Sequence, residues 1–267
     1  MGRAPVSKLI DKLKQVSQAE PQPMGFRAAQ GVSPKPKMLL VASLAQVDVS
    51  GVADYVAGAD AGLLPVPKLS SGPKTIQKIS QVVSGIPWGG WLRGVGGEGI
   101  KQMVKVGCDF VVFPAANTPL AMLQDDEVGK ILQVEASLSD GLLRTIPGLP
   151  VDAVLIAGEQ AKDYFLTWHH LMLFRRFASV LTKPLLVSIP SNVSANELQA
   201  LWDAGVDGVV VTVGAGQPAG GLKGLRQAID KLTFPASRKR GKTEALLPRI
   251  DREADVVSEE EEEEEEE

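Results

Sequence analysis

Two charged residues of this sequence are candidates for catalysis, Glu135 as an acid or base and Lys68 as an assisting group. Glu135 lies near the end of an apolar run at 130–136, and Lys68 follows an earlier run at 62–66. The alternation along 130–136 turns Glu135 inward, and a carboxylate buried without a partner is costly. Such a group is expected to be paired, hydrogen-bonded or protonated, which is how proteins prepare general acids and bases. An ion pair with Lys68 or Arg93 that only ties loops together is the alternative.

A second set of residues is suited to holding a ligand. The same alternation turns Ser43, Ser188 and Thr212 inward, where small hydroxyl groups would leave space that bulky side chains would fill. Glycines and a cation in neighbouring loops could then contact an anion through the backbone or by charge. The expected ligand-binding residues are Arg93, Asn117, Ser188, Thr212, Gly214 and Gly216.

The segment GAGQPA, at 214–219, matches the residue pattern of a dinucleotide-binding fingerprint but not the context that this motif requires. That motif needs an acidic residue about 20 positions later at the end of a strand, and here the chain continues as FPASRKRGK. A nicotinamide site is therefore not expected. Two interpretations stay open: a loop of unobstructed backbone amides that holds a phosphate or similar anion, and a turn that needs positive φ.

Neither a metal nor a cofactor is expected. Cys108 is the single cysteine, and the two histidines, His169 and His170, are adjacent in the sequence. These residues can form no disulfide framework and no zinc pattern.

Eight short apolar runs alternate with helical periodicity, which predicts a parallel sheet joined by right-handed crossovers. Runs that are apolar on both faces indicate strands covered by helices outside and packed within. Eight such units predict a (β/α)8 barrel over 37–234, with a doubly wound open sheet as the alternative. The expected strands are 38–44, 62–66, 86–92, 109–113, 130–136, 152–157, 184–189 and 207–213. The expected helices are 49–57, 74–84, 98–106, 119–128, 140–149, 163–182, 195–204 and 222–232.

The segments on either side of the barrel have different characters. Within 1–36, the sequence VSKLIDKLKQV predicts an amphipathic helix that packs against the lower mouth of the barrel, with attachment to an anionic membrane surface as the alternative. The tail, 235–267, carries the basic block SRKRGK and then nine glutamates, and it is expected to be disordered. Removing 259–267 changes the net charge from −4 to +5. The glutamates could also fold back on a basic surface and compete with an anionic partner.

Partners and location are predicted from what the chain exposes. The helix at 163–182 carries Phe165, Trp168, Met172 and Phe174, which predicts a contact between copies of the chain, with core packing as the alternative. A small anionic metabolite is expected, and no specific nucleic acid, because only SRKRGK favours one and acidic residues follow it. No run reaches 18 apolar residues, so no transmembrane segment and a cytoplasmic location are expected.

The segments WDAGVDGVVVTVGAG and VKVGCDFVVFP resemble the ribulose-phosphate-binding barrels, a group that includes thiamine phosphate synthase. The resemblance covers mainly the last two strand-helix units. It implies the same barrel and an anion site after the last strand. The chain departs from the group after strand seven, where it has SIPSN in place of a second glycine-rich turn, and it lacks the strand-end lysine or aspartate catalysts.

Two hypotheses of function follow. One is an enzyme on a small phosphorylated or carboxylated metabolite, with the anion at Gly214 and Gly216 and Glu135 as acid or base. The other is a barrel without catalysis that serves as a binding or scaffold protein through its helices and charged tail. The scarcity of strand-end lysine, histidine and aspartate favours the second.

Overall fold

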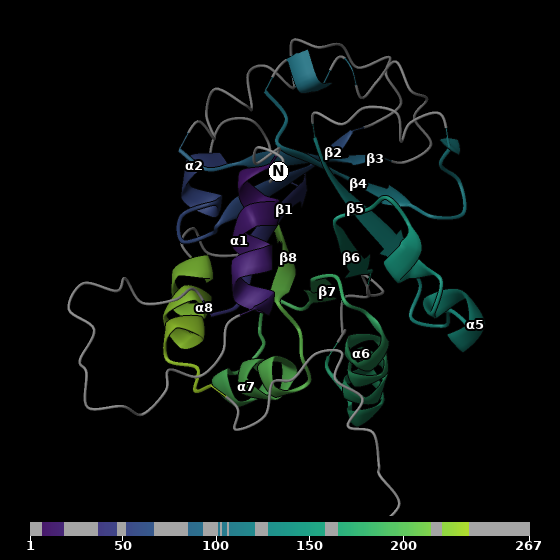
Figure 1. Ribbon diagram of the computed structural model, residues 1–267. Coiled ribbons are helices and arrows are strands. Elements are labelled where there is room, and N and C mark those ends of the chain that lie inside the picture. The colour runs from purple at the N-terminus through teal and green to yellow at the C-terminus, as the bar shows by residue number, and fades with distance from the viewer. Residues whose placement is uncertain are drawn as a thin grey trace, which may run out of the picture.

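The computed structural model describes residues 7–18, 37–46, 52–66, 85–92, 101, 103–105, 107–120, 128–157, 165–214 and 221–234. Eight parallel strands follow the order of the chain around a closed barrel (Figure 1). Closure confirms the predicted (β/α)8 barrel and excludes the open sheet, and each strand lies within two residues of its predicted bounds. The strands are β1 Leu39–Gln46, β2 Ala61–Val66, β3 Trp88–Leu92, β4 Phe110–Pro114, β5 Gly129–Val134, β6 Ala153–Ile156, β7 Leu185–Ile189 and β8 Gly208–Gly214.

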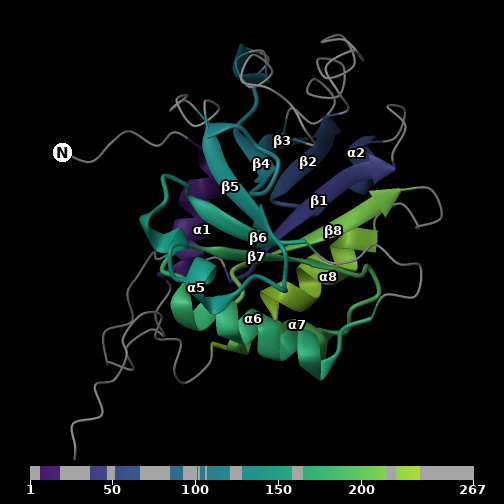
Figure 2. The same ribbon diagram turned by 90° about the vertical axis from the view of Figure 1, so that its right-hand side faces the viewer.

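The described helices include α6, α7 and α8, which lie together along one side of this barrel (Figure 2). Their bounds are α1 Lys8–Ser17, α2 Val52–Tyr55, α5 Asp140–Leu143, α6 Trp168–Val180, α7 Ala195–Asp203 and α8 Gly221–Asp230, with a 3₁₀ turn at Ile146–Gly148. The helices expected at 74–84 and 119–128 lie wholly or mostly outside the described residues, as does the tail at 235–267. None of the described helices combines the length and the apolar character needed to cross a membrane.

The register of the strands shows which side chains face the interior. Gly129 on β5 and Gly208 on β8 stand on distant strands, yet a Cβ at either position would meet side chains of α1. The single helix α1 can contact both of these strands only if it lies across one end of the barrel. Gly129 and Gly208 therefore face the interior of the barrel. Because paired residues share a face, the pairing then places Ser43, Trp91, Gln133, Ser188 and Thr212 on the inner face as well.

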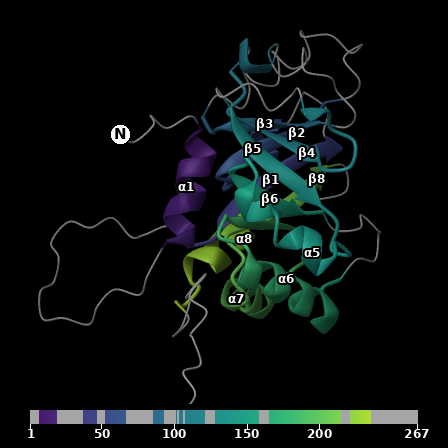
Figure 3. The ribbon, with the colours of Figure 1, turned by 45° about the vertical axis from the view of Figure 1, so that its right-hand side comes forward.

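Helix α1 closes the amino-terminal end of the barrel, as predicted from its amphipathic sequence. Leu9, Ile10 and Leu13 are at most 3% exposed. Asp109, which precedes β4, accepts hydrogen bonds from the backbone N–H groups of Lys8 and Leu9 at 2.8 and 3.0 Å and so caps the helix. Figure 3 shows α1 lying across the starts of the strands, on the opposite side from the arrowheads of β1 and β8 in Figure 2.

Aspartates precede all four even-numbered strands, and three of them fasten neighbouring strands together at this end. Asp60, Asp152 and Asp207 accept hydrogen bonds from the backbone N–H groups of β1, β5 and β7, from Leu40, Lys130 and Leu185 respectively, at 2.7–2.9 Å. Asp60 also pairs with Arg226 of α8 at 2.8 Å. Carboxylates at the amino ends of barrel strands are therefore structural here, which leaves the opposite end for chemistry.

Candidate functional site

The interior of the barrel opens to solvent at the carboxyl ends of the strands. Of the strand residues whose burial the structure describes, five are partly exposed and the rest are buried. All five face inward, whereas the outward-facing strand residues beside them are buried wherever their burial is described. Val134, Ile189 and Val213, for example, are at most 5% exposed. The partly exposed residues are Pro65, Pro114, Gln133, Ser188 and Thr212.

This ring of five residues has a polar side and an apolar side. Gln133, Ser188 and Thr212 come from β5, β7 and β8, and the two prolines come from β2 and β4. All three polar side chains are uncharged. A ligand at this end would therefore meet hydrogen-bonding groups along one arc and hydrocarbon along the other.

The strand pairing fixes the heights of the inward side chains. In one direction the paired residues lead from Ser43 through Leu63, Gly89 and Phe110 to Gly129 on β5. In the other direction Ser43 pairs with Thr212 of β8. Continuing the observed residue pairing across β7 and β6 leads to position 137 of β5. This difference of eight is the shear of a (β/α)8 barrel, in which side chains of equal height come from alternate strands.

Because the strands are tilted, the residue of β5 at the same height along the barrel axis as Ser43 lies midway between positions 129 and 137. That residue is Gln133, on the opposite side of the barrel from Ser43. The same construction places Trp91 of β3 and Ser188 of β7 at this height, so these four side chains form one layer. A direct contact agrees with the construction: the indole Nε1 of Trp91 donates a hydrogen bond to Oε1 of Gln133 at 2.6 Å. Trp91 is 4% exposed, so it lies under the open end and supports Gln133 from within.

Ser43 brings an unsatisfied hydroxyl to the same layer. Its side chain is fully buried, and its Oγ has no hydrogen-bond partner among the described residues. Nearly all buried polar groups find a partner, so an exception marks a place where a ligand atom or a water molecule would be stabilised. Ser43 pairs in register with Thr212, one of the partly exposed residues.

The sequence-predicted ligand residues are only partly brought together. Ser188, Thr212 and Gly214 lie on the adjacent strands β7 and β8, and the hydroxyl-bearing pair faces inward as expected. Asn117 is exposed in the turn after β4, where Thr118 Oγ1 donates to Pro114 O at 2.7 Å. Lys68, Arg93 and Gly216 lie outside the described residues.

The expectation that Glu135 is buried inside the barrel is wrong. Strand β5 ends at Val134, so Glu135 lies one residue beyond it and is exposed. Its Oε2 accepts a hydrogen bond from Ser137 Oγ at 3.2 Å. The costly burial from which an acid or base role was argued is absent, and such a role stays a prediction that depends on the position of Glu135 at the rim of the open end.

Gln133 is the residue that the candidate set omitted, and its contact with Trp91 gives it a fixed position. Alternation along β5 already turns Gln133 inward, but it does not separate a hydrogen-bonding residue at the mouth from one that fills the interior. The contact that distinguishes Gln133 comes from a strand 42 positions earlier in the chain and depends on closure of the barrel. Neither composition nor periodicity contains this information.

Cys108 is buried away from the open end. Its Sγ donates to Phe110 O at 3.0 Å, and burial raises the pKa of the thiol to about 12. A thiol with so high a pKa carries almost no thiolate at neutral pH and is not a nucleophile. The described residues contain no group of three or more His, Cys, Asp or Glu side chains arranged to hold a metal ion.

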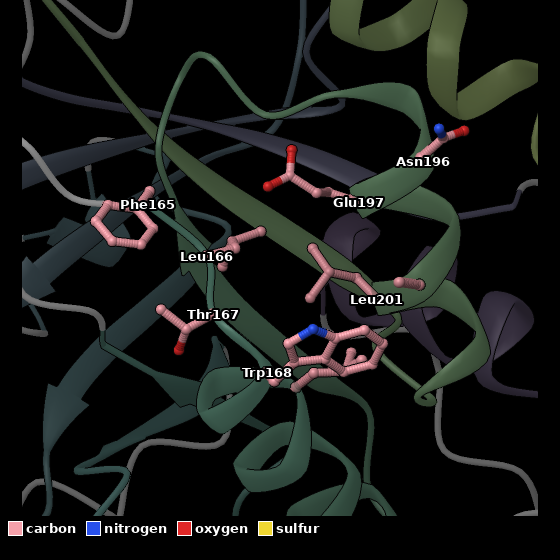
Figure 4. Close-up of a pocket in the computed structure, with 9 residues that line it drawn as sticks. Phe165, Leu166, Thr167, Trp168, Asn196, Glu197 and Leu201 are labelled. Carbon is pink, nitrogen blue, oxygen red and sulfur yellow. The ribbon is translucent and has the colours of Figure 1, made fainter.

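A second candidate site is an apolar groove between the first turns of α6 and α7. Its volume is about 530 Å³, within the range of ligand sites. Figure 4 shows Leu166, just before α6, and Trp168, the first residue of α6, beside Leu201 of α7. The groove is lined by Phe165, Leu166, Thr167, Trp168, Leu171, Asn196, Glu197, Ala200 and Leu201.

Polar groups in this groove are used to cap the two helices. Thr167 and His170 form a capping box at α6, and Ser194 and Glu197 form one at α7. Glu197 accepts from both Oγ and N of Ser194, at 2.6 and 2.8 Å, and these hydrogen bonds lower the pKa of its carboxyl group. The groove therefore offers mainly hydrocarbon to an incoming molecule.

Three of the four apolar side chains predicted for a contact between copies are exposed. Phe165, Trp168 and Met172 are 67%, 82% and 69% exposed. Phe174 is 3% exposed and belongs to the core, so its assignment to a contact surface is wrong. The helical period turns Phe174 to a different face of α6 from Trp168, and that face packs against the barrel.

No protein-family model and no curated protein matches this sequence. Solved structures do match. A thiamine phosphate pyrophosphorylase from Pyrococcus furiosus aligns with a TM-score of 0.56 and 15% identity over 73% of this chain and 96% of that chain. A tryptophan synthase from M. tuberculosis aligns with a TM-score of 0.54 and 14% identity over 73% and 92% of the two chains.

A mutant tryptophan synthase alpha-subunit from Pyrococcus furiosus gives a TM-score of 0.53 and 13% identity over 73% and 96% of the two chains. At such identities the likeness is one of fold. The site of this chain must therefore be argued from its own residues. In its architecture the protein is a (β/α)8 barrel, and it shares this fold with the solved structures named above.

Proposed function

We propose that this protein binds a small phosphorylated or carboxylated metabolite at the open, carboxyl-terminal end of its barrel and acts on it as an enzyme. One observation carries the proposal. The strand residues that keep exposure are the inward-facing ones at this end, and three of them are polar: Gln133, Ser188 and Thr212. Active sites of (β/α)8 barrels lie at this end because loops from all eight strands converge there.

The anion is assigned to the end of β8 and the start of α8. Strand β8 ends at Gly214 and α8 begins at Gly221. The first turn of α8 contains no acidic side chain, and a Cβ at Gly221 would meet nothing within 4 Å. Free backbone N–H groups and the helix dipole at such an end attract anions. Gly216 and Arg93 complete this part of the proposal from the sequence. Glu135, as acid or base, and Lys68, as an assisting residue, remain the candidate catalytic residues.

The similar structures support an anionic ligand without identifying it. One of them is named for thiamine phosphate. This chain shares its fold and places glycine at the end of the last strand, but lacks the strand-end catalysts that the resemblance implies. The proposal therefore names the class of ligand and leaves the reaction to experiment.

Thermal unfolding with inorganic phosphate, sulfate and sugar phosphates tests this proposal. A ligand that binds the folded state at ten times its Kd stabilises it by about 1.4 kcal/mol. For a barrel of this size the melting temperature should rise by about 3–6 °C. Gly221→Asp places a carboxylate in the first turn of α8, which stabilises the helix but repels an anion. We expect this variant to melt no lower than the natural protein and to lose the anion-dependent rise.

Gly148→Asp is the matched control. A Cβ at Gly148 also meets nothing within 4 Å, and its 3₁₀ turn immediately precedes β6, at the amino-terminal end of the barrel. The control should keep the full anion-dependent rise. If no anion raises the melting temperature, or if both variants respond alike, the anion site at α8 is wrong.

The groove between α6 and α7 favours a second candidate function, a binding or scaffold role through contact between two copies of the chain. The exposed fractions of Phe165 and Trp168 leave about 300–350 Å² of aromatic surface uncovered, since such side chains bury 150–250 Å² each. That is over a third of the roughly 800 Å² that one partner contributes to a standard interface. Protruding aromatic side chains beside an apolar groove suit a two-fold contact, in which each copy fills the groove of the other. The oligomeric state of a Trp168→Glu variant tests it.

A further inference from the structure

The polar arc at the open end contains a hydrogen-bond donor whose direction is set by its neighbour. A glutamine amide can present either its oxygen or its nitrogen to a partner. The indole Nε1–H of Trp91 can only donate, so it selects Oε1 of Gln133, and the 2.6 Å contact holds that orientation. The Nε2 amino group of Gln133 must then point away from Trp91. It has no acceptor among the described residues, and the side chain is partly exposed.

The layer around this amide is polar but uncharged. Ser43 and Ser188 share the height of Gln133 and Trp91, and the hydroxyl of Ser43 has no partner among the described residues. Thr212, paired with Ser43, adds a hydroxyl group beside it. A charged ligand group placed here would lose its hydration and meet no counter-charge from this layer, which is costly. An uncharged ligand oxygen would instead accept a hydrogen bond from the Nε2 amino group of Gln133.

We infer that Gln133 is the specificity-determining residue of the site, and that it donates from Nε2 to an uncharged carbonyl or hydroxyl oxygen of the anionic ligand. Trp91 is a positioning residue that acts through Gln133. This inference rests on the proposed anion site and adds the class of substrate: a phosphate monoester that carries a neutral oxygen acceptor, with its apolar edge toward Pro65 and Pro114. The anion lies at β8 and α8, and the acceptor lies toward β5.

Calorimetric titration with four probes tests this inference. Dihydroxyacetone phosphate offers a carbonyl, and glycerol 3-phosphate offers hydroxyl groups. Propyl phosphate has the same length without an acceptor, and inorganic phosphate reports on the anion site alone. We expect the first two to bind about three- to ten-fold more tightly than propyl phosphate, the range for one neutral hydrogen bond.

Gln133→Met keeps the size of the side chain and removes the donor. In this variant the preference over propyl phosphate should disappear, while the affinity for inorganic phosphate stays unchanged. Trp91→Phe keeps an aromatic ring and removes the N–H, so the amide is free to turn and the preference should fall part of the way. A purely structural role for either residue would weaken all four probes together.

The outcomes separate the two proposals. If inorganic phosphate fails to bind the natural protein, the anion site and this inference both fail. If inorganic phosphate and propyl phosphate bind but the oxygen-bearing probes are not preferred, this inference alone is wrong. It is equally wrong if Gln133→Met retains the preference. A variant with a lowered melting temperature is still informative, because unchanged binding of inorganic phosphate shows that the folded site is intact.

Discussion

The aspartates at the amino-terminal end of the barrel have a structural role: their carboxylates accept hydrogen bonds from backbone N–H groups of neighbouring strands. Asp207 is 1% exposed, and its Oδ2 accepts from the backbone N–H of Leu185 at 2.7 Å. Asp60 and Asp152 hold the starts of β1 and β5 in the same way. At the opposite end the inward-facing polar side chains of the described strands are neutral. Gln133 and Ser43 have hydrogen-bonding capacity that the described protein leaves unused.

Replacing Asp207 tests the structural role. Asp207→Ala leaves the N–H of Leu185 buried without this acceptor, and we expect the free energy of unfolding to fall by about 1–3 kcal/mol. Urea unfolding followed by circular dichroism measures the change. Asp203→Ala is the control, because Asp203 is exposed on α7 and bonds to Gln199 at the surface. Its effect should stay within about 0.5 kcal/mol. Equal losses in the two variants would contradict the fastening role.

At the scale of elements, the groups that cap the N-termini of α6, α7 and α8 differ, and this difference affects what can bind beside each helix. Helices α6 and α7 begin with capping boxes that use their own side chains, whereas α8 begins with glycine and has no acidic residue in its first turn. The start of α8 is therefore the helix end at which we propose that an anion binds. Helix α1 instead closes the other end, where Asp109 caps it.

The cap of α7 should make stability depend on pH. The hydrogen bonds from Ser194 lower the pKa of Glu197 in the folded state from 4.5. A lowered pKa means stability that is fully present above the unfolded value and is lost as the pH falls through the folded value. Glu197→Gln keeps a capping side chain without the charge. We expect the natural protein to be more stable by about 0.3–1 kcal/mol at neutral pH, the usual size of a charge at a helix end.

That advantage should shrink below about pH 4.5, as the carboxylate gains a proton. Urea unfolding of both proteins between pH 3.5 and pH 7 measures the difference. A difference that does not change over this range would show that the charge of Glu197 contributes nothing to the cap.

On the scale of the whole molecule, one end of the barrel is closed, the other is open, and the flank at α6 and α7 presents an apolar surface. Trp168 is 82% exposed beside the groove, while the core residue Phe174 on the same helix is covered. A surface of this kind on a single chain favours association. The groove is lined by residues at the starts of α6 and α7, whereas the open end is lined by inward-facing strand residues, so different substitutions test self-association and metabolite binding.

Trp168→Glu should weaken association of two copies. We expect the natural protein to elute as a dimer in light-scattering chromatography at micromolar concentration, and the variant to elute as a monomer with an unchanged circular dichroism spectrum. His169→Glu adds the same residue to the next, exposed position of α6, about 100 degrees around the helix, and should leave the dimer intact. A natural protein that is monomeric at hundreds of micromolar would contradict the contact.

Prediction from the sequence succeeded where the physical signal was local. Parallel strands buried on both faces appear as continuous apolar runs, so all eight were found within two residues. Alternation correctly turned Ser188 and Thr212 inward. The same reasoning failed at Glu135, because β5 ends one residue before it and the alternation no longer applies. Phe174 was misassigned because apolar character alone does not tell a core face from an exposed one.

The sequence by itself determined the barrel, the amphipathic helix at its amino-terminal end and the hydroxyl groups of Ser43, Ser188 and Thr212 on its inner wall. These features depend on periods of two and 3.6 residues, which neighbours along the chain express. Only the tertiary structure decided that Gln133 meets Trp91, that Ser43 stands level with both, and that Glu135 is exposed. Those relations depend on the shear with which eight strands close, a property of the whole ring that no stretch of sequence contains.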